Sequence, residues 1–135
     1  MNKKLFISVP MNGYTEDEID KMMNYLKDTA EAYFGEFFDI LETHRFVRVP
    51  KNAKNDRIYM LGDSIKQYLS KADYYIGITD KDCVDYLIRG CAVENLVWKI
   101  YYPNEGNALY CDYSIMCKNL KIPKRKAAKR KAGKK

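Results

Sequence analysis

The sequence predicts an α/β fold in which helices cover both faces of a parallel sheet of four to five strands. Short apolar runs alternate with longer amphipathic stretches along the 135 residues, in the order strand, helix, strand, helix, strand, helix, strand. That alternation is typical of parallel sheets with helical crossovers. Capping and breaking residues mark several of the boundaries. Hydrophobic residues make up 47% of the chain, which is enough for one globular domain with its own core.

The first strand is predicted at residues 4–10, where "KLFISVP" is a short apolar run that ends at Pro10. An uninterrupted apolar run is typical of a strand that is buried on both faces. Residues 11–13, "MNG", follow as a turn, because Gly13 can adopt a positive φ without steric cost.

The first helix is predicted at residues 16–34. Thr15 lies three residues before Glu18, which is the spacing of a capping box. Gly35 is the expected stop. The apolar residues recur at helical spacing and form the expected inward face: Ile19, Met22, Met23, Leu26 and Ala30.

The middle of the chain repeats the pattern. Residues 37–44, "FFDILETH", are predicted to form the second strand, and the polar residues 45–56 a loop. Residues 57–72 are predicted to form the second helix, followed by a third strand at residues 73–80. The second helix is expected to turn four side chains inward: Leu61, Ile65, Tyr68 and Leu69.

The third helix is predicted within residues 86–102, "YLIRGCAVENLVWKIYY", and residues 103–106, "PNEG", end it. Residues 107–115, "NALYCDYSI", are expected to form the fourth strand. Apolar residues at three- and four-residue spacing predict the buried face of the helix: Val93, Val97, Ile100 and Tyr101.

The positive charge of the chain is concentrated at its C-terminus. Residues 124–135 hold eight basic residues and no acidic one, so the net charge of +6 becomes −2 for residues 1–123. Lysine, alanine and glycine cannot bury enough apolar area to fold, so we expect an α/β domain over residues 1–123 and a disordered tail over residues 124–135. The tail is either a non-specific nucleic-acid contact or a solubilising end without a specific partner.

The remaining composition excludes several classes. No run of eighteen apolar residues occurs, so we expect no membrane span. The four cysteines form no CxxC pair, and one histidine, His44, is present. Zinc sites and disulfide frameworks need other spacings, so we expect reduced thiols, no metal, no cofactor and a cytoplasmic location.

A ligand crevice is expected at the carboxyl ends of the strands, as in other open parallel sheets. Residues 9–13, the loop after residues 37–44, and residues 79–90 converge at that edge. Glu94 follows within the first turns of the third helix. A carboxylate placed there either faces the crevice or interacts favourably with the helix dipole.

Three segments carry a resemblance to a known family: "FISVPMNG" at residues 6–13, "LGDSIKQYLSKADYYIGI" at residues 61–78, and "RGCAVE" at residues 89–94. Together they resemble the small nucleoside 2-deoxyribosyltransferase-like proteins, in particular short bacterial and phage proteins of the DUF4406 type. The resemblance covers roughly residues 5–100, with the motifs in the same order. It implies a flavodoxin/Rossmann-like sheet of five strands and assembly as a homodimer or higher homo-oligomer.

The resemblance also implies a reaction. In the catalytic relatives, the glutamate of the glycine-x-x-x-glutamate motif attacks the anomeric carbon of a deoxyribose and displaces the base. Gly90 and Glu94 match that motif, which makes Glu94 the expected nucleophile of a nucleoside or nucleotide N-glycosidase or deoxyribosyltransferase. The resemblance further implies that Asp73 lies near the site, and Asp85 is a candidate acid for the leaving base.

The same resemblance implies the groups that would hold a nucleoside or nucleotide. Gly90 would let the backbone approach the sugar, and Arg89 would neutralise a phosphate or orient a carboxylate. The remaining expected substrate-binding residues are Ser8, Pro10, Met11, Asn12, Gly13 and Ser64. The chain departs from many relatives at Asn95, where they have a histidine directly after the glutamate.

Three functional classes remain open from the sequence. The first is the enzyme that acts on an N-glycosidic bond. The second is a nucleotide-binding module, for sensing or sequestering, that has the crevice without turnover. The third is a nucleic-acid-associated protein that acts through residues 124–135.

Overall fold

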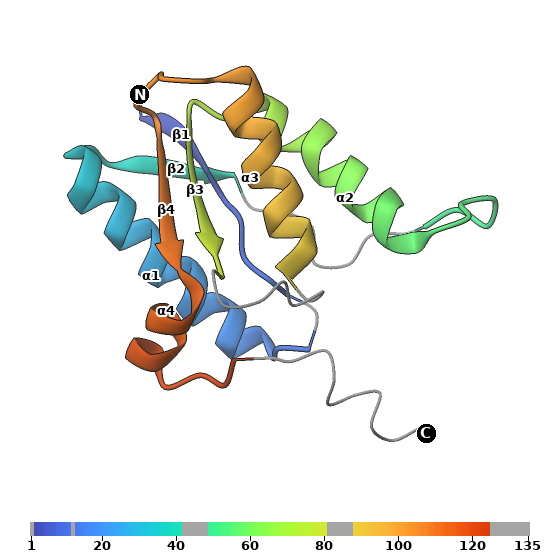
Figure 1. Cartoon of the computed structure of the whole chain (residues 1–135), viewed down its shortest axis with the longest axis horizontal. Helices are drawn as coiled ribbons and strands as arrows, with labels where there is room; N and C mark the ends of the chain where they lie inside the picture. The colour runs from blue at the N-terminus through green and yellow to red at the C-terminus, as the bar shows by residue number, and fades with distance from the viewer. Residues whose placement is uncertain (1, 12, 42–48, 81–87, 125–135) are drawn as a thin grey trace.

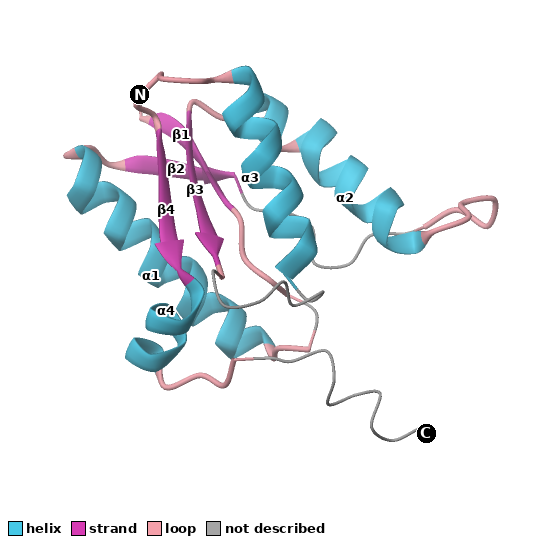
Figure 2. Ribbon diagram, in the orientation of Figure 1, coloured by secondary structure: helices cyan, strands magenta, loops and turns pink. Residues whose placement is uncertain are grey.

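The computed structural model describes residues 2–11, 13–41, 49–80 and 88–124. Within these ranges the chain forms an α/β fold, with an all-parallel four-stranded sheet and four α-helices, consistent with a Rossmann-like architecture (Figures 1 and 2). In chain order the elements are β1 (Lys3–Ile7), α1 (Glu16–Phe34), β2 (Phe38–Leu41), α2 (Asp56–Gln67), the 3₁₀ helix η1 (Leu69–Lys71), β3 (Tyr74–Thr79), α3 (Arg89–Tyr101), β4 (Ala108–Asp112) and α4 (Tyr113–Leu120). None of the helices in these ranges is long and apolar enough to cross a membrane.

The strands are ordered β2-β1-β3-β4, so the first strand of the chain is central. Leu5 of β1 lies opposite Ile40 of β2 on one side and Tyr74 of β3 on the other. The α/β class and the parallel sheet predicted from the sequence are confirmed. The described residues contain no fifth strand, so the sheet has the smaller of the two predicted sizes.

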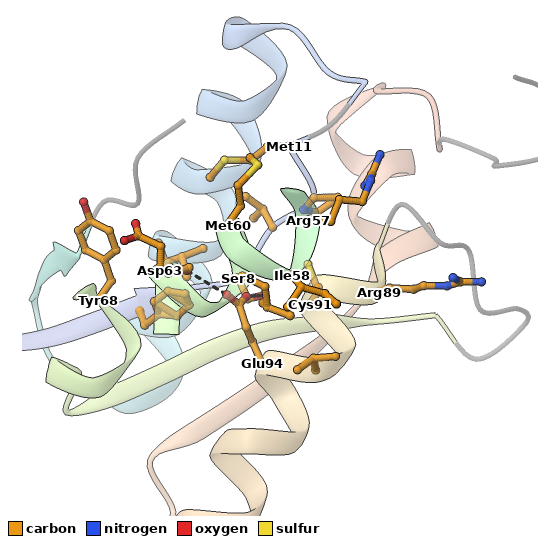
Figure 3. A pocket seen from close by; sticks show the side chains of 18 of the residues that line it. Ser8, Met11, Arg57, Ile58, Met60, Asp63, Tyr68, Arg89, Cys91 and Glu94 are labelled. Atoms are coloured by element: carbon orange, nitrogen blue, oxygen red, sulfur yellow. Dashed lines mark hydrogen bonds between the residues drawn. The ribbon is translucent and has the colours of Figure 1, made fainter. Parts of the chain in front are cut away.

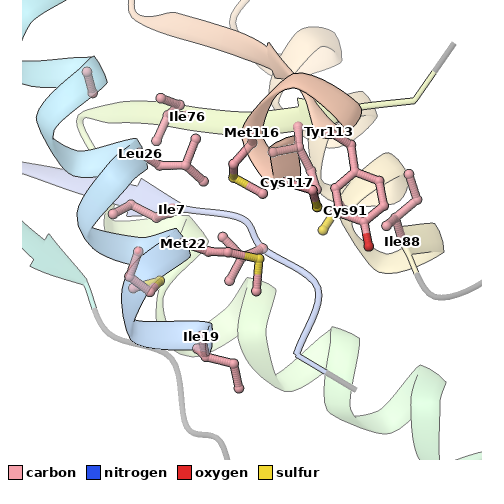
Figure 4. Close-up of a cluster of buried hydrophobic side chains, with 14 of the residues drawn as sticks. Ile7, Ile19, Met22, Leu26, Ile76, Ile88, Cys91, Tyr113, Met116 and Cys117 are labelled. Carbon is pink, nitrogen blue, oxygen red and sulfur yellow. The ribbon is translucent and has the colours of Figure 1, made fainter. Parts of the chain in front are cut away.

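Alternate side chains of β1 contact opposite helical layers. Leu5 and Ile7 belong to the apolar cluster that α1 and α4 cover (Figure 4). Phe6 belongs to a second cluster with Tyr75 and Trp98, on the side of α2 and α3. Figure 1 shows the two layers, with α1 and α4 against one face of the sheet and α2 and α3 against the other. This two-sided burial explains why the first strand is a continuous apolar run.

The first helix follows its sequence prediction closely. α1 covers the predicted residues, with both hydrogen bonds of the capping box between Thr15 and Glu18. Gly35 ends the helix in the left-handed conformation with φ 71°. The five apolar residues predicted to face inward are all buried.

The predicted inward face of the third helix is wrong. Val93, Ile100 and Tyr101 are exposed. The residues that α3 buries are Cys91, Glu94, Asn95 and Trp98. The buried face therefore includes two polar side chains, which an argument from apolar spacing does not select.

The buried Asn95 is accommodated because its hydrogen-bonding groups are satisfied by β3. Its amide nitrogen donates to the carbonyl oxygen of Ile78 at 2.8 Å, and its oxygen accepts from the hydroxyl of Tyr75. A Cβ atom at Gly77 would overlap the Asn95 side-chain oxygen. The glycine in the strand thus makes room for the asparagine and lets α3 lie close to the sheet.

The ends of three further segments differ from the prediction. The fourth strand was expected to extend to residue 115, but it ends at Asp112, whose Oδ1 caps α4 by accepting from the backbone N–H of Ile115 at 2.9 Å. The second helix ends at Gln67, and η1 replaces its expected last turn. Lys124, assigned to the tail, instead forms an ion pair with Asp80 at 3.0 Å. Residues 125–135 lie outside the described residues.

Candidate active site

A cavity of about 440 Å³ opens between α2, α3 and the segment that follows β1 (Figure 3). It lies on the α2–α3 side of the sheet, at the carboxyl end of β1, where the sequence predicts a crevice. A cavity of this size is within the usual range for small-molecule sites. Apolar side chains of all three elements line it, including Val9, Ile58, Met60, Leu61 and Val93.

Glu94 lies at the centre of this cavity, and its carboxylate accepts hydrogen bonds from two serines. The Oγ of Ser8 donates to Oε1 at 2.6 Å, and the Oγ of Ser64 donates to Oε2 at 3.0 Å. Ser8 follows β1 two residues after Phe6, so its side chain points to the same face of the sheet. Ser64 lies in the last turns of α2. The carboxylate therefore joins three elements that are distant in sequence.

Burial shifts the protonation equilibrium of Glu94. The side chain is 7% exposed, and loss of hydration raises the pKa of its carboxyl group. The hydrogen bonds from Ser8 and Ser64 act in the opposite direction, because they stabilise the ionised form. The net direction is upward. Each carboxylate oxygen accepts one serine hydroxyl and has a further lone pair.

Seven of the residues predicted for the site line the cavity together. They are Ser8, Pro10, Met11, Ser64, Arg89, Gly90 and Glu94. They come from the segment that follows β1, from α2 and from α3. Gly90, however, lies in the first turn of α3 and not in a turn before it. A Cβ atom at Gly90 would meet Leu61 at an ordinary contact distance of 3.9 Å.

The structure does not bring Asp73 to the cavity. Asp73 precedes β3, at the amino end of the sheet, and its Oδ2 accepts from the backbone N–H of Lys4 at 2.9 Å. This bond supports the start of the β1–β3 pairing, and the expected place of Asp73 near the site is corrected accordingly. Gly13 lies in an exposed turn with φ 90° and does not line the cavity either. Asn12 and Asp85 lie outside the described residues.

Sequence reasoning missed the polar residues that α2 and its C-cap contribute. Asp63, Arg57 and Tyr68 line the cavity, and none was predicted to do so. Arg57 and Ser64 are seven residues apart, a spacing that places two residues on the same face of a helix. Because Ser64 was predicted to lie in the site, the same spacing could have predicted Arg57 there. Among the described residues, no group of three or more metal-ligating side chains occurs, and the expected absence of a metal stays a prediction.

No family model, no curated protein and no solved structure matches this chain. The resemblance stated from the three sequence motifs therefore stays a prediction.

The cavity brings together groups suited to displacement at carbon. The Glu94 carboxylate is buried, and hydrogen bonds from two serines fix its orientation. Asp63 supplies a second carboxyl group to the same cavity. Cys91 also lines it, but burial raises the pKa of this thiol to about 12, so the thiolate is not available as a nucleophile at neutral pH.

Proposed function

We propose that this protein cleaves or exchanges the N-glycosidic bond of a nucleoside or nucleotide, with Glu94 as the nucleophile. The observation that carries the proposal is the Glu94 carboxylate, hydrogen-bonded to Ser8 and Ser64 inside a cavity that Asp63 also lines. A pair of carboxyl groups, one nucleophilic and one acting as acid and base, is the arrangement that retaining glycosidases use.

In the first step, an oxygen of Glu94 forms a bond to the anomeric carbon of the sugar. The bond from that carbon to the base nitrogen breaks, and its electron pair goes to the nitrogen. Asp63 acts as the general acid and gives a proton to the departing base. The products of this step are the free base and a sugar ester of Glu94. Asp63 takes the role for which the sequence suggested Asp85, which lies outside the described residues.

In the second step, water or the nitrogen of another base attacks the same carbon. Asp63, now a carboxylate, takes the proton from the attacking group, and Glu94 leaves as a carboxylate. The hydroxyl groups of Ser8 and Ser64 stabilise the negative charge that returns to Glu94, because hydrogen bonds to ionised groups are stronger than those between neutral groups. Hydrolysis and transfer differ only in which nucleophile enters.

The experiment compares the protein with Glu94→Gln, using a mixture of deoxynucleosides and their 5′-monophosphates. Free base is followed by chromatography and mass spectrometry. The glutamine keeps the shape of the side chain and can still form hydrogen bonds with both serines, so the variant should fold. Glu105→Gln, on the loop between α3 and β4, is the matched control. We expect base release by the wild type and the control, and none by Glu94→Gln.

One observation favours a second function, nucleotide binding without turnover. Both oxygens of Glu94 already accept hydrogen bonds, and little of the side chain is exposed. A binding module would show thermal stabilisation by a nucleotide and no free base, in the wild type as in Glu94→Gln. That result would contradict the enzymatic proposal for the substrates in the mixture.

A further inference from the structure

The charged residues of the cavity are unevenly distributed. Figure 3 shows Arg57 and Arg89 on one side of Glu94, and Asp63 and Tyr68 on the other. The helices agree with this view. Arg57 is about 10 Å along α2 from Ser64, and Arg89 is about 7 Å along α3 from Glu94, at 1.5 Å per residue. Both arginines therefore lie toward the start of their helices, and the Ser64–Glu94 hydrogen bond links the two helices beyond them.

Among the described residues, the basic side chains that line the cavity are all arginines. Arg57 and Arg89 are the only arginines in the described ranges, and both line this cavity. Twelve lysines lie in the same ranges, and none of them lines it. A solubilising surface would not separate the two residue types in this way. Guanidinium groups bind phosphate through paired hydrogen bonds, a geometry that the ammonium group of lysine lacks.

We infer that the substrate is a nucleoside 5′-monophosphate and that Arg57 and Arg89 bind its phosphate. This inference rests on the proposed function of Glu94. In such a substrate the phosphate and the base lie on opposite sides of the anomeric carbon, separated by the sugar. The residues follow the matching order: Arg57 and Arg89 on one side, then Glu94, then Asp63 on the opposite side (Figure 3).

Electrostatic repulsion would fix the direction of binding. The Glu94 carboxylate disfavours a phosphate at its end of the cavity, while the two arginines attract it to theirs. The base is then left at the end where Asp63 supplies its proton. A free nucleoside lacks the charged group and would lose both the attraction and the orientation.

The test measures kcat/KM for deoxynucleoside monophosphates and for the corresponding deoxynucleosides, with the wild type, Arg57→Ala and Arg89→Ala. Lys66→Ala, an exposed charge removal on α2 outside the cavity, is the matched control. We expect each arginine variant to lose roughly tenfold to a hundredfold in kcat/KM for the monophosphates, as for a lost hydrogen bond to a charged group. The control should retain the wild-type value, and the loss in each arginine variant should be smaller for the nucleosides than for the monophosphates.

A direct binding measurement uses Glu94→Gln, which is expected to bind without reacting. Calorimetry with a monophosphate, its nucleoside and inorganic phosphate should give the tightest binding for the monophosphate, weakening as salt is raised. Equal activity on nucleosides and monophosphates, with no effect of either arginine variant, would overturn the inference and leave the role of Glu94 intact. Absence of base release from every substrate would instead contradict the proposed function, and with it the inference that rests on it.

Discussion

Glu94 is the residue on which the chemistry depends, and its two hydroxyl partners set its acidity. The variant Ser8→Ala removes the shorter hydrogen bond, 2.6 Å, and leaves the carboxylate less well stabilised. We predict that the acid limb of the pH–rate profile for base release moves to higher pH by about 1–2 units. Ser70→Ala is the control, because Ser70 donates only to the carbonyl of Lys66 at the surface. An unmoved acid limb in Ser8→Ala would contradict the assignment of that limb to Glu94.

The raised pKa of Glu94 also predicts how stability depends on pH. A carboxyl group whose pKa is higher in the folded protein binds more protons there than in the unfolded chain. Its contribution to the free energy of unfolding is present below the ordinary pKa of a glutamate and is lost as the pH rises through the folded-state value. We predict that Glu94→Gln removes this loss. Urea denaturation of the wild type and Glu94→Gln from pH 4 to pH 8 measures the free energy of unfolding of each protein. If that free energy depends on pH in the same way in both, the prediction is refuted.

At the scale of elements, the contact between α3 and β3 positions Glu94 beside the sheet. Gly77→Ala would place a methyl group against the Asn95 and Tyr75 side chains. We predict a loss of about 1–3 kcal/mol in the free energy of unfolding, as for other overpacked sites. Gly62→Ala, at an exposed position of α2 with nothing within 4 Å, should be neutral or stabilising by up to about 1 kcal/mol. Equal effects in denaturant titrations would contradict the packing argument.

The same contact shows how far the sequence predicts the structure. α1 could be predicted to the residue, because its capping box and terminal glycine are local signals. The buried face of α3 could not be predicted. Glu94 and Asn95 can be buried because Ser8, Ser64 and β3 supply their hydrogen-bond partners. For the site, seven of the lining residues were predicted from the motifs, while Asp63 and Arg57 depend on the orientation of α2. Asp73 was misplaced because the resemblance assigned it to the site, although a residue that precedes a strand of a parallel sheet lies at the end opposite the cavity.

At the scale of the whole molecule, Lys124 ties the end of the domain to the sheet. Its ammonium group contacts the buried carboxylate of Asp80 at 3.0 Å and the hydroxyl of Ser114 at 2.9 Å. A chain that ends after Lys124 should have the same free energy of unfolding as the full protein. Lys124→Ala should lower the free energy of unfolding by about 1–3 kcal/mol. This loss is smaller than for a fully buried ion pair, because Lys124 is partly exposed. Thermal denaturation of the full protein, the shortened chain and Lys124→Ala measures these differences. The same melting temperature in Lys124→Ala and the full protein would contradict the prediction.

The basic residues 125–135 provide a separate test of the nucleic-acid hypothesis. If they act as a phosphate-backbone contact, the full chain should bind DNA or RNA with strongly salt-dependent affinity, and the chain ending after Lys124 should not. Base release should be the same in both forms, because every residue assigned to the chemistry lies before the tail. Equal nucleic-acid binding by the two forms would leave the tail as a solubilising end.

The most direct test of the central claim is the mass of the protein during turnover. The protein is mixed with a deoxynucleoside monophosphate, quenched in acid within its first turnovers, and digested for peptide mapping. We predict a deoxyribose phosphate adduct on the peptide that contains Glu94, and none in Glu94→Gln. Base release that continues in Glu94→Gln without any adduct would show that Glu94 is not the nucleophile.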